Sequence, residues 1–246
     1  MHGFDGLAFV AQGGPVSIGV ALILLVMSVA SWYLMLTKGW RVILLRKAVA
    51  NYCRAFWLSP SLQAALDTRQ ANNPAWRLTS QAVEAAEHYQ QHAAKRLPDA
   101  CSHDEFVARA MRRVIGEETA RLESGLSVLA SVGSVAPFVG LFGTVWGIYH
   151  ALASISASGQ ATLDKVAGPV GEALIMTALG LAVAIPAVLA YNALVRSNRV
   201  LLGRLDHFGQ DLLVLLTTGA PLAAGSASSA ERTSAKPAMH LKEVPA

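Results

Sequence analysis

Residues 168–192 read GPVGEALIMTALGLAVAIPAVLAYN. At about 1.5 Å of rise per residue, a helix over this stretch is long enough to cross a bilayer. On a helical wheel its small residues share one narrow stripe, with larger apolar residues on one flank. The stripe holds Ala173, Thr177, Gly180, Ala184 and Ala187, and the flank holds Leu174, Ala178, Leu181, Ile185 and Val188. We therefore expect a transmembrane helix with one face for close packing and one for lipid.

Glu172 is the one ionisable side chain in the apolar body of this stretch. A carboxylate in hydrocarbon costs at least about 2.5 kcal/mol, so it is rarely found there without a partner, a cavity or a task. Because Glu172 lies within about the first turn, it could instead reach the headgroups, and this alternative stays open. Thr177 lies deeper in the helix, about 140° round the wheel from Glu172, which is wide for one shared lumen.

The composition is that of a membrane protein. Of 246 residues, 53% are hydrophobic and 15% charged, and the mean hydropathy is +0.42. A net charge of +4 could indicate nucleic acid. However, many of the basic residues cluster at the ends of apolar runs, so we expect no nucleic-acid partner. Cys53 and Cys101 are too few for a disulfide scaffold and are expected to stay reduced in the cytoplasm.

The N-terminal part predicts a first membrane span over residues 15–37. Residues 1–14 contain no Lys or Arg, and Pro15 suits a first helical turn. A signal peptide would need basic residues before its apolar run, whereas here they follow it, beginning at Lys38. We therefore expect an uncleaved helix whose N-terminus, residues 1–14, lies outside.

Residues 38–125 are more polar and are expected to form a cytoplasmic helical region. Residues 42–58 predict an amphipathic continuation of the first span, and residues 78–96 a separate helix after several prolines. From Asp104 onward, apolar residues recur at helical spacing, and no proline separates them from the next apolar run. We therefore expect one long helix that leaves the cytoplasm and enters the membrane.

Residues 126–155 predict the second membrane span. Small residues recur in it at three- and four-residue spacing, a pattern that lets transmembrane helices approach closely. This seam includes Gly140, Gly143, Gly147 and Ala151, and we expect Ala173, Gly180 and Ala184 to serve the same packing and oligomerisation in the third span. Pro137 and Pro186 are expected to kink their helices.

The remaining segments complete a three-span topology. Residues 156–167 are expected to form a short outer loop, residues 168–192 the third span, residues 193–218 a cytoplasmic helix, and residues 219–246 a disordered cytoplasmic tail. Of the 20 Lys and Arg residues, Lys165 alone falls on the expected outer side. The predicted fold is thus all-α, with the second and third spans extended into the cytoplasm.

The residues indicate a channel more than an enzyme. We find no phosphate-binding loop, no H-E-x-x-H motif and no Cys/His set at metal spacing, and expect neither metal nor cofactor. The polar set within the spans is Glu172, Thr144 and Thr177. Hydroxyls can donate and accept, and a desolvated carboxyl can exchange a proton near neutral pH. Alternatively, each threonine satisfies a carbonyl of its own helix.

Three spans are too few to enclose a pathway for protons within one chain. We therefore expect several copies of the chain to form an oligomer around a central pore.

Two long motifs carry a resemblance to a known family. They are APFVGLFGTVWGIYHAL (residues 136–152) and VAGPVGEALIMTALGLAVAIPAVLAYN (residues 166–192). Together they resemble the ExbB/TolQ/MotA proton-channel family, and most of all its ExbB members. By position, Glu172 matches the acid of the family's third span, and Thr144 and Thr177 match its pore-lining threonines. Gly168–Gly171 varies within the family, which leaves open where the third helix starts and how deep Glu172 lies.

The resemblance implies a homopentamer in the inner membrane of a Gram-negative bacterium. Its pore would surround the single-span helices of a smaller partner, ExbD, which supplies an essential aspartate. Proton flow would drive TonB and thereby outer-membrane uptake of siderophores, haem or cobalamin. A TolQ-type subunit of the Tol-Pal system, a sodium-driven stator and a purely structural membrane scaffold are the alternatives.

Overall fold

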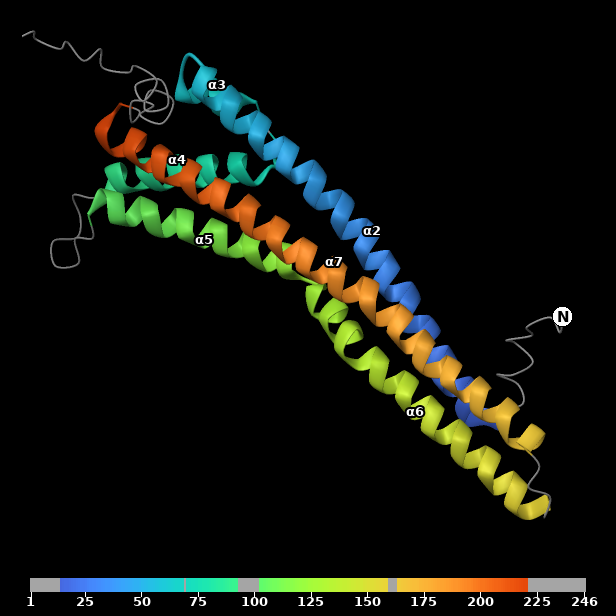
Figure 1. The fold of residues 1–246 in the computed structure, drawn as a ribbon. Coiled ribbons are helices and arrows are strands. Elements are labelled where there is room, and N and C mark those ends of the chain that lie inside the picture. The colour runs from blue at the N-terminus through green and yellow to red at the C-terminus, as the bar shows by residue number, and fades with distance from the viewer. Residues whose placement is uncertain (1–13, 69, 93–101, 159–162, 221–246) are drawn as a thin grey trace, which may run out of the picture. The chain divides into compact units, whose positions relative to one another are not determined.

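The computed structural model describes residues 14–68, 70–92, 102–158 and 163–220, apart from the side chains of residues 154, 157–158, 163–169 and 172. These residues form six α-helices, and no strand occurs among them. The helices are α2 (Gly14–Leu58), α3 (Leu62–Asp67), α4 (Pro74–His92), α5 (His103–Glu123), α6 (Leu126–Ser158) and α7 (Leu163–Thr218), shown in Figure 1. The all-α class expected from the sequence is confirmed.

Three stretches are long and apolar enough to cross a membrane, as the sequence predicts. They are Pro15–Leu58, His103–Ala153 and Ala173–Thr218. Helix α2 is a single helix of 45 residues, so the apolar run and the amphipathic stretch after it are continuous. Helix α7 begins at Leu163, before the start expected for the third span, and continues without a break to Thr218. The expected tail falls almost entirely on residues 221–246, which lie outside the described residues.

The expectation of one unbroken helix from the polar region into the second span is wrong. Helix α5 ends at Glu123 and α6 begins at Leu126. Between them Gly125 adopts a φ of +77°, a left-handed conformation that ends α-helices and strongly favours glycine. Gly125 was the signal in the sequence, because a helix can end at a glycine without any proline nearby. The charged and apolar halves are therefore separate helices.

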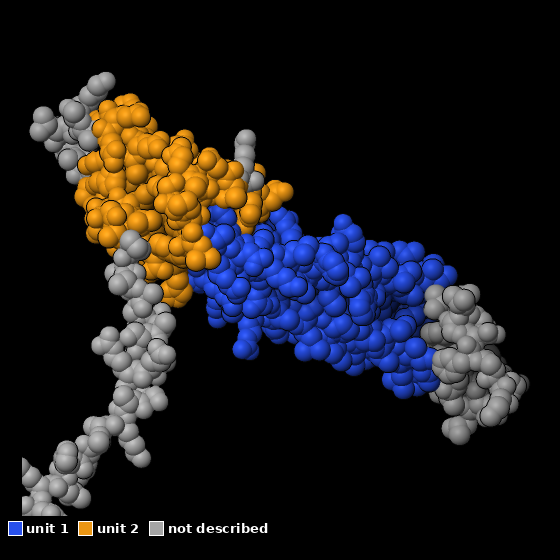
Figure 2. Space-filling view, turned by 90° about the horizontal axis from the view of Figure 1, so that it is seen from above, with its two compact units in different colours: residues 1–55, 116–204 blue, residues 56–115, 205–246 orange. Residues whose placement is uncertain are grey.

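The chain divides into two compact units, coloured separately in Figure 2. The first contains residues 1–55 and 116–204. Within it, α6 runs alongside the N-terminal half of α7 (Figure 1), and α2 contributes Val20 next to Gly143 and Leu34 next to Gly125. The apolar stretches of all three candidate spans meet in this unit.

The second unit, residues 56–115 and 205–246, is a small helical bundle. Leu78 of α4, Val107 of α5 and Leu212 of α7 are fully buried. Gly209 of α7 allows close packing, because a Cβ there would lie 3.2 Å from Met111 Cε. Side chains cap the helices: Ser61 Oγ accepts from the Ala64 N–H, and Asn73 Oδ1 from the Ala75 N–H.

The break at Gly125 gives a test of the fold. We expect Gly125→Ala to destabilise the protein by about 1–2 kcal/mol, because an L-residue is strained at positive φ. The matched control is Gly116→Ala in α5, where a Cβ meets nothing within 4 Å. That change is expected to be neutral or to stabilise by up to about 1 kcal/mol, since Ala favours helix. The Tm of each variant in detergent is the measurement. Equal shifts for Gly125→Ala and Gly116→Ala would contradict the strain assigned to an L-residue at position 125.

Candidate functional site

The centre of the first unit is a close contact between α6 and α7. A Cβ placed on Gly140 would lie 2.5 Å from the Met176 carbonyl oxygen. One placed on Gly180 would lie 2.7 Å from the Ala136 carbonyl oxygen and 3.1 Å from Gly140 Cα. Backbone atoms are therefore in contact across the two helices, which only glycine permits at these positions.

The same seam continues toward the other end of the helix pair and to α2. A Cβ on Gly147 would lie 2.9 Å from Ala173 Cβ, and one on Gly143 would lie 2.9 Å from Val20 Cγ1. Ala151 and Ala184 are also buried. The structure thus places the small residues singled out in the two spans between helices of one chain.

The exposure of the side chains of α7 follows the two faces predicted by the helical wheel, a small-residue stripe and an apolar flank. Ala173, Ala184 and Ala187 are buried, at most 4% exposed, and Gly180 is buried with them. The apolar flank is exposed, with Leu174 at 56% and Ile185 at 57%. An apolar face left uncovered in a single chain is typical of a surface that contacts lipid or another subunit. Helix α6 has a similar face, with Phe138, Val145 and Tyr149 all more than half exposed.

Thr144 of α6 and Thr177 of α7 are brought together beside the glycine contact. Thr144 is 5% exposed, and its Oγ1 donates to the Gly140 carbonyl oxygen over 2.9 Å. The two threonine hydroxyls also form a short hydrogen bond. Since the Thr144 hydrogen is used on Gly140, the shared hydrogen comes from Thr177. The alternative in which a threonine satisfies a carbonyl of its own helix therefore holds for Thr144, whereas Thr177 donates across to α6.

The third residue of the expected polar set, Glu172, has a described backbone but no described side chain. Glu172 lies in α7, one turn before Met176, but its side chain is outside the described part of the chain. The structure therefore brings Thr144 and Thr177 together and does not join Glu172 to them. Pro137 and Pro186 both lie inside helices, α6 and α7, which continue through them. No cluster of metal-ligating side chains occurs among the described residues.

A second polar cluster surrounds the break at Gly125, and the sequence analysis did not single it out. Asn198 of α7 is 4% exposed, and its Nδ2 donates to the Leu122 carbonyl oxygen over 3.2 Å. Lys38 Nζ donates to Ser124 Oγ over 3.0 Å. Both contacts serve the end of α5, where backbone carbonyls lack partners within the helix. An Asn in the middle of a long helix was the available signal.

Glu118 belongs to the same cluster. It is 4% exposed and its Oε1 accepts from Arg121 Nη1 over 3.2 Å. The Arg41 charge also acts on this carboxyl. The chain ahead of α6 therefore carries a buried acid next to two guanidinium groups.

The described residues form helices only, with three candidate membrane spans and a glycine-mediated contact between two of them. These features are typical of a multi-span membrane protein whose spans contact lipid or other subunits.

The comparison with known proteins specifies the family. The profile of the MotA/TolQ/ExbB proton channel family matches residues 71–207, and the chain belongs to that family. It is 42% identical to the Biopolymer transport protein ExbB of Xanthomonas campestris pv. campestris (strain B100), covering 88% of this chain and 89% of that protein. The ExbB of Neisseria meningitidis serogroup A is 42% identical over 83% and 94%. The Tol-Pal system protein TolQ of Pseudomonas aeruginosa is 37% identical over 80% and 86%.

The glycine contact predicts a strong position dependence for alanine. We expect Gly140→Ala and Gly180→Ala each to destabilise the protein by about 1–3 kcal/mol, because the new methyl group meets backbone atoms that cannot rotate away. Gly171→Ala in α7, the helix of Gly180, is the matched control, since a Cβ there meets nothing within 4 Å. Tm in detergent is the measurement. If Gly171→Ala lowers Tm as much as the other two variants do, the loss of stability does not come from the backbone contact at Gly140 and Gly180.

Proposed function

We propose that this chain is an ExbB-type subunit of a proton-driven motor in the inner membrane of a Gram-negative bacterium. With an ExbD-like partner it uses the proton-motive force to energise TonB-dependent uptake of siderophores, haem or cobalamin through outer-membrane receptors. The observation that carries the proposal is membership of the proton channel family across residues 71–207, the region that contains both threonines and Glu172.

The proposed conducting group is the Glu172 carboxyl, with Thr144 and Thr177 lining the path next to it. The hydroxyl pair supports this assignment because it is a polar hydrogen-bonded unit within an otherwise apolar helix pair. One hydroxyl chain that ends on a backbone carbonyl cannot relay a proton by itself. The acid is therefore the group that takes up and releases the proton, and the threonines position water or the partner's acid near it.

The proposed assembly is a homopentamer around the single-span helices of the ExbD-like partner. The exposed apolar faces of α6 and α7 support association with other chains or with lipid. The N-terminus is proposed to be periplasmic and the C-terminus cytoplasmic, because Lys and Arg follow the first span and are almost absent from its outer side.

A TolQ-type role is the second candidate. The specific observation in its favour is the 37% identity to the Pseudomonas aeruginosa TolQ over 80% of this chain. We favour the ExbB-type role because the two ExbB relatives reported above are more similar, at 42% over 88% and 83% of the chain.

The motor proposal predicts that Glu172→Gln abolishes energised uptake. The substitution keeps the size and hydrogen bonding of the side chain but removes its ability to exchange a proton. In cells that depend on this chain, we expect siderophore-dependent growth to fall to the level of the deletion strain, with unchanged amounts of the protein in the membrane. Uptake of a labelled ferric siderophore measures the effect directly.

The matched control is Glu87→Gln, which removes an exposed carboxylate of α4 far along the chain from the spans. It should retain full uptake. Full uptake by Glu172→Gln would leave the structural scaffold as the better explanation. Uptake that requires Na⁺ and fails when K⁺ replaces it would instead identify a sodium-driven stator.

Complementation separates the two candidate systems. Expressed in a host with both its ExbB and TolQ genes removed, together with its own partner proteins, this chain is expected to restore growth on ferric siderophores. We expect it to leave the detergent sensitivity of the envelope largely uncorrected. The reverse pattern, with detergent resistance restored and siderophore growth absent, would assign the chain to the Tol-Pal system.

A further inference from the structure

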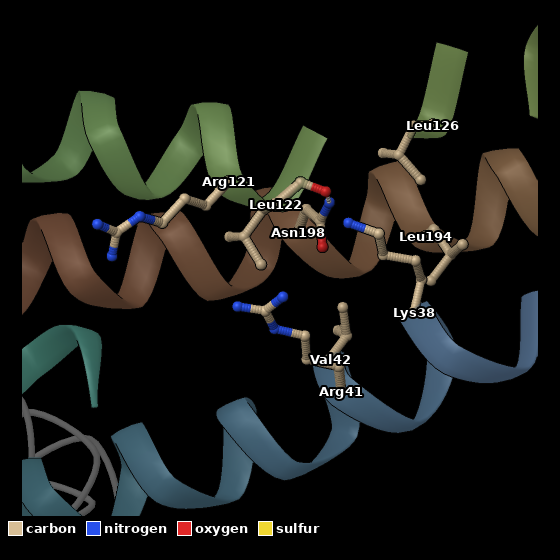
Figure 3. Close-up of a pocket in the computed structure, with 8 residues that line it drawn as sticks. All are labelled: Lys38, Arg41, Val42, Arg121, Leu122, Leu126, Leu194 and Asn198. Carbon is tan, nitrogen blue, oxygen red and sulfur yellow. Dashed lines mark hydrogen bonds between the residues drawn. The ribbon is translucent and has the colours of Figure 1, made fainter. Parts of the chain in front are cut away.

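A small cleft lies beside the break between α5 and α6, within the first unit. Three segments of the chain line it: α2 with Lys38, Arg41 and Val42, the α5–α6 junction with Arg121, Leu122 and Leu126, and α7 with Leu194 and Asn198 (Figure 3). The cleft is open to its surroundings and encloses little space of its own. The lining therefore combines cationic and apolar side chains with one amide.

The cleft has more positive than negative charge. Lys38, Arg41 and Arg121 line it. Glu118 lies next to them, pairs with Arg121 over 3.2 Å and interacts electrostatically with Arg41, and Glu117 lies close to Glu118. The Lys38 ammonium hydrogen-bonds a neutral hydroxyl, Ser124 Oγ. The lining itself carries three cations and no carboxylate, and the two acids nearby leave the site net positive, which favours an anion.

Asn198 adds a second, independent feature. It is 4% exposed, and its Nδ2 is used on the Leu122 carbonyl oxygen. Its Oδ1 is buried and has no hydrogen-bond partner among the described residues. Figure 3 shows Lys38 and Arg41 extending from α2 toward α7, where the Asn198 side chain lies. A buried oxygen without a partner is unfavourable, so a group that brings a hydroxyl donor to this point would be stabilised.

The position of the cleft along α2 indicates where such a group comes from. Lys38 directly follows the apolar run of residues 15–37, so it lies where a span ends and headgroups begin. The cleft also has apolar lining residues, Val42, Leu122, Leu126 and Leu194, against which the start of an acyl chain could lie. Basic pockets between transmembrane helices at this depth are suited to anionic headgroups.

We propose that this cleft binds the phosphate group of an anionic phospholipid with a polyol headgroup, as in phosphatidylglycerol. Lys38 and Arg41 hold the phosphate oxygens, Arg121 lies at the rim, and a headgroup hydroxyl donates to Asn198 Oδ1. The lipid thereby joins α2, the α5–α6 junction and α7 at one point. The proposal is independent of proton conduction.

The test uses the full chain purified in detergent and stripped of lipid. Native mass spectrometry follows the binding of dioctanoyl phosphatidylglycerol and of dioctanoyl phosphatidylcholine, which has the same tails and no net charge. We expect phosphatidylglycerol to bind at least about tenfold more tightly. Dioctanoyl phosphatidylmethanol keeps the charge but lacks the hydroxyls, and we expect it to bind several-fold more weakly than phosphatidylglycerol. Equal binding of these two anionic lipids would overturn the role of Asn198.

Charge-matched variants separate the cleft from general attraction. We expect Lys38→Gln with Arg41→Gln to lower phosphatidylglycerol binding to the phosphatidylcholine level. The control pair is Arg196→Gln with Arg199→Gln, two exposed cations of α7 that do not line the cleft, and it should bind as the unchanged protein does. Equal losses in both pairs, or no preference for the anionic lipid, would overturn the site.

A single variant covers the case in which the double variant fails to fold. If the double variant loses its helical content, Arg41→Gln alone replaces it, and Arg41→Lys is expected to retain binding.

A competition experiment identifies the source of the phosphate group. Glycerol 3-phosphate at equal concentration should not displace the lipid. Displacement would mean that a soluble phosphate compound, and not a lipid, is the natural occupant, and would overturn the lipid assignment.

Discussion

Close contact between two helix backbones is the constraint on which the first unit depends. Lipid tails are as apolar as leucine, so spans gain little by hiding apolar side chains from lipid. They gain instead from dense packing, and Gly140 opposite Gly180 provides it with Cα atoms close enough that an added methyl group would lie 3.1 Å from the opposite Cα. Further close approaches, such as Gly147 to Ala173, continue the same seam.

The threonine pair is the main consequence. Thr144 lies one turn after Gly140 and Thr177 lies three residues before Gly180, so the contact brings their hydroxyls within hydrogen-bond reach. Thr144 also satisfies its own helix through the Gly140 carbonyl oxygen. A polar unit in apolar surroundings is stable here because each hydroxyl hydrogen has an acceptor.

The end of α5 requires a different solution. A helix that stops inside a packed protein leaves carbonyl oxygens to be satisfied. Asn198 of α7 serves Leu122, and Ser124, itself held by Lys38, donates to the Arg121 carbonyl oxygen. Three segments distant in sequence thus fix the point at which the chain changes from an amphipathic helix to an apolar one, and the same residues create the cationic cleft.

What the sequence by itself determined is the periodic part of the structure. Apolar runs of membrane length specified three helices, and the spacing of small residues specified which face of α7 is buried, because both properties depend only on rise and angle per residue. Only the tertiary structure decided the break at Gly125, the partner of Thr177 and the role of Asn198. A single glycine is compatible with helix interiors and helix ends alike, and a hydroxyl or an amide takes its partner from whichever helix packs against it. Such choices depend on residues far apart in the chain, as Leu122 and Asn198 are, and no local pattern records them.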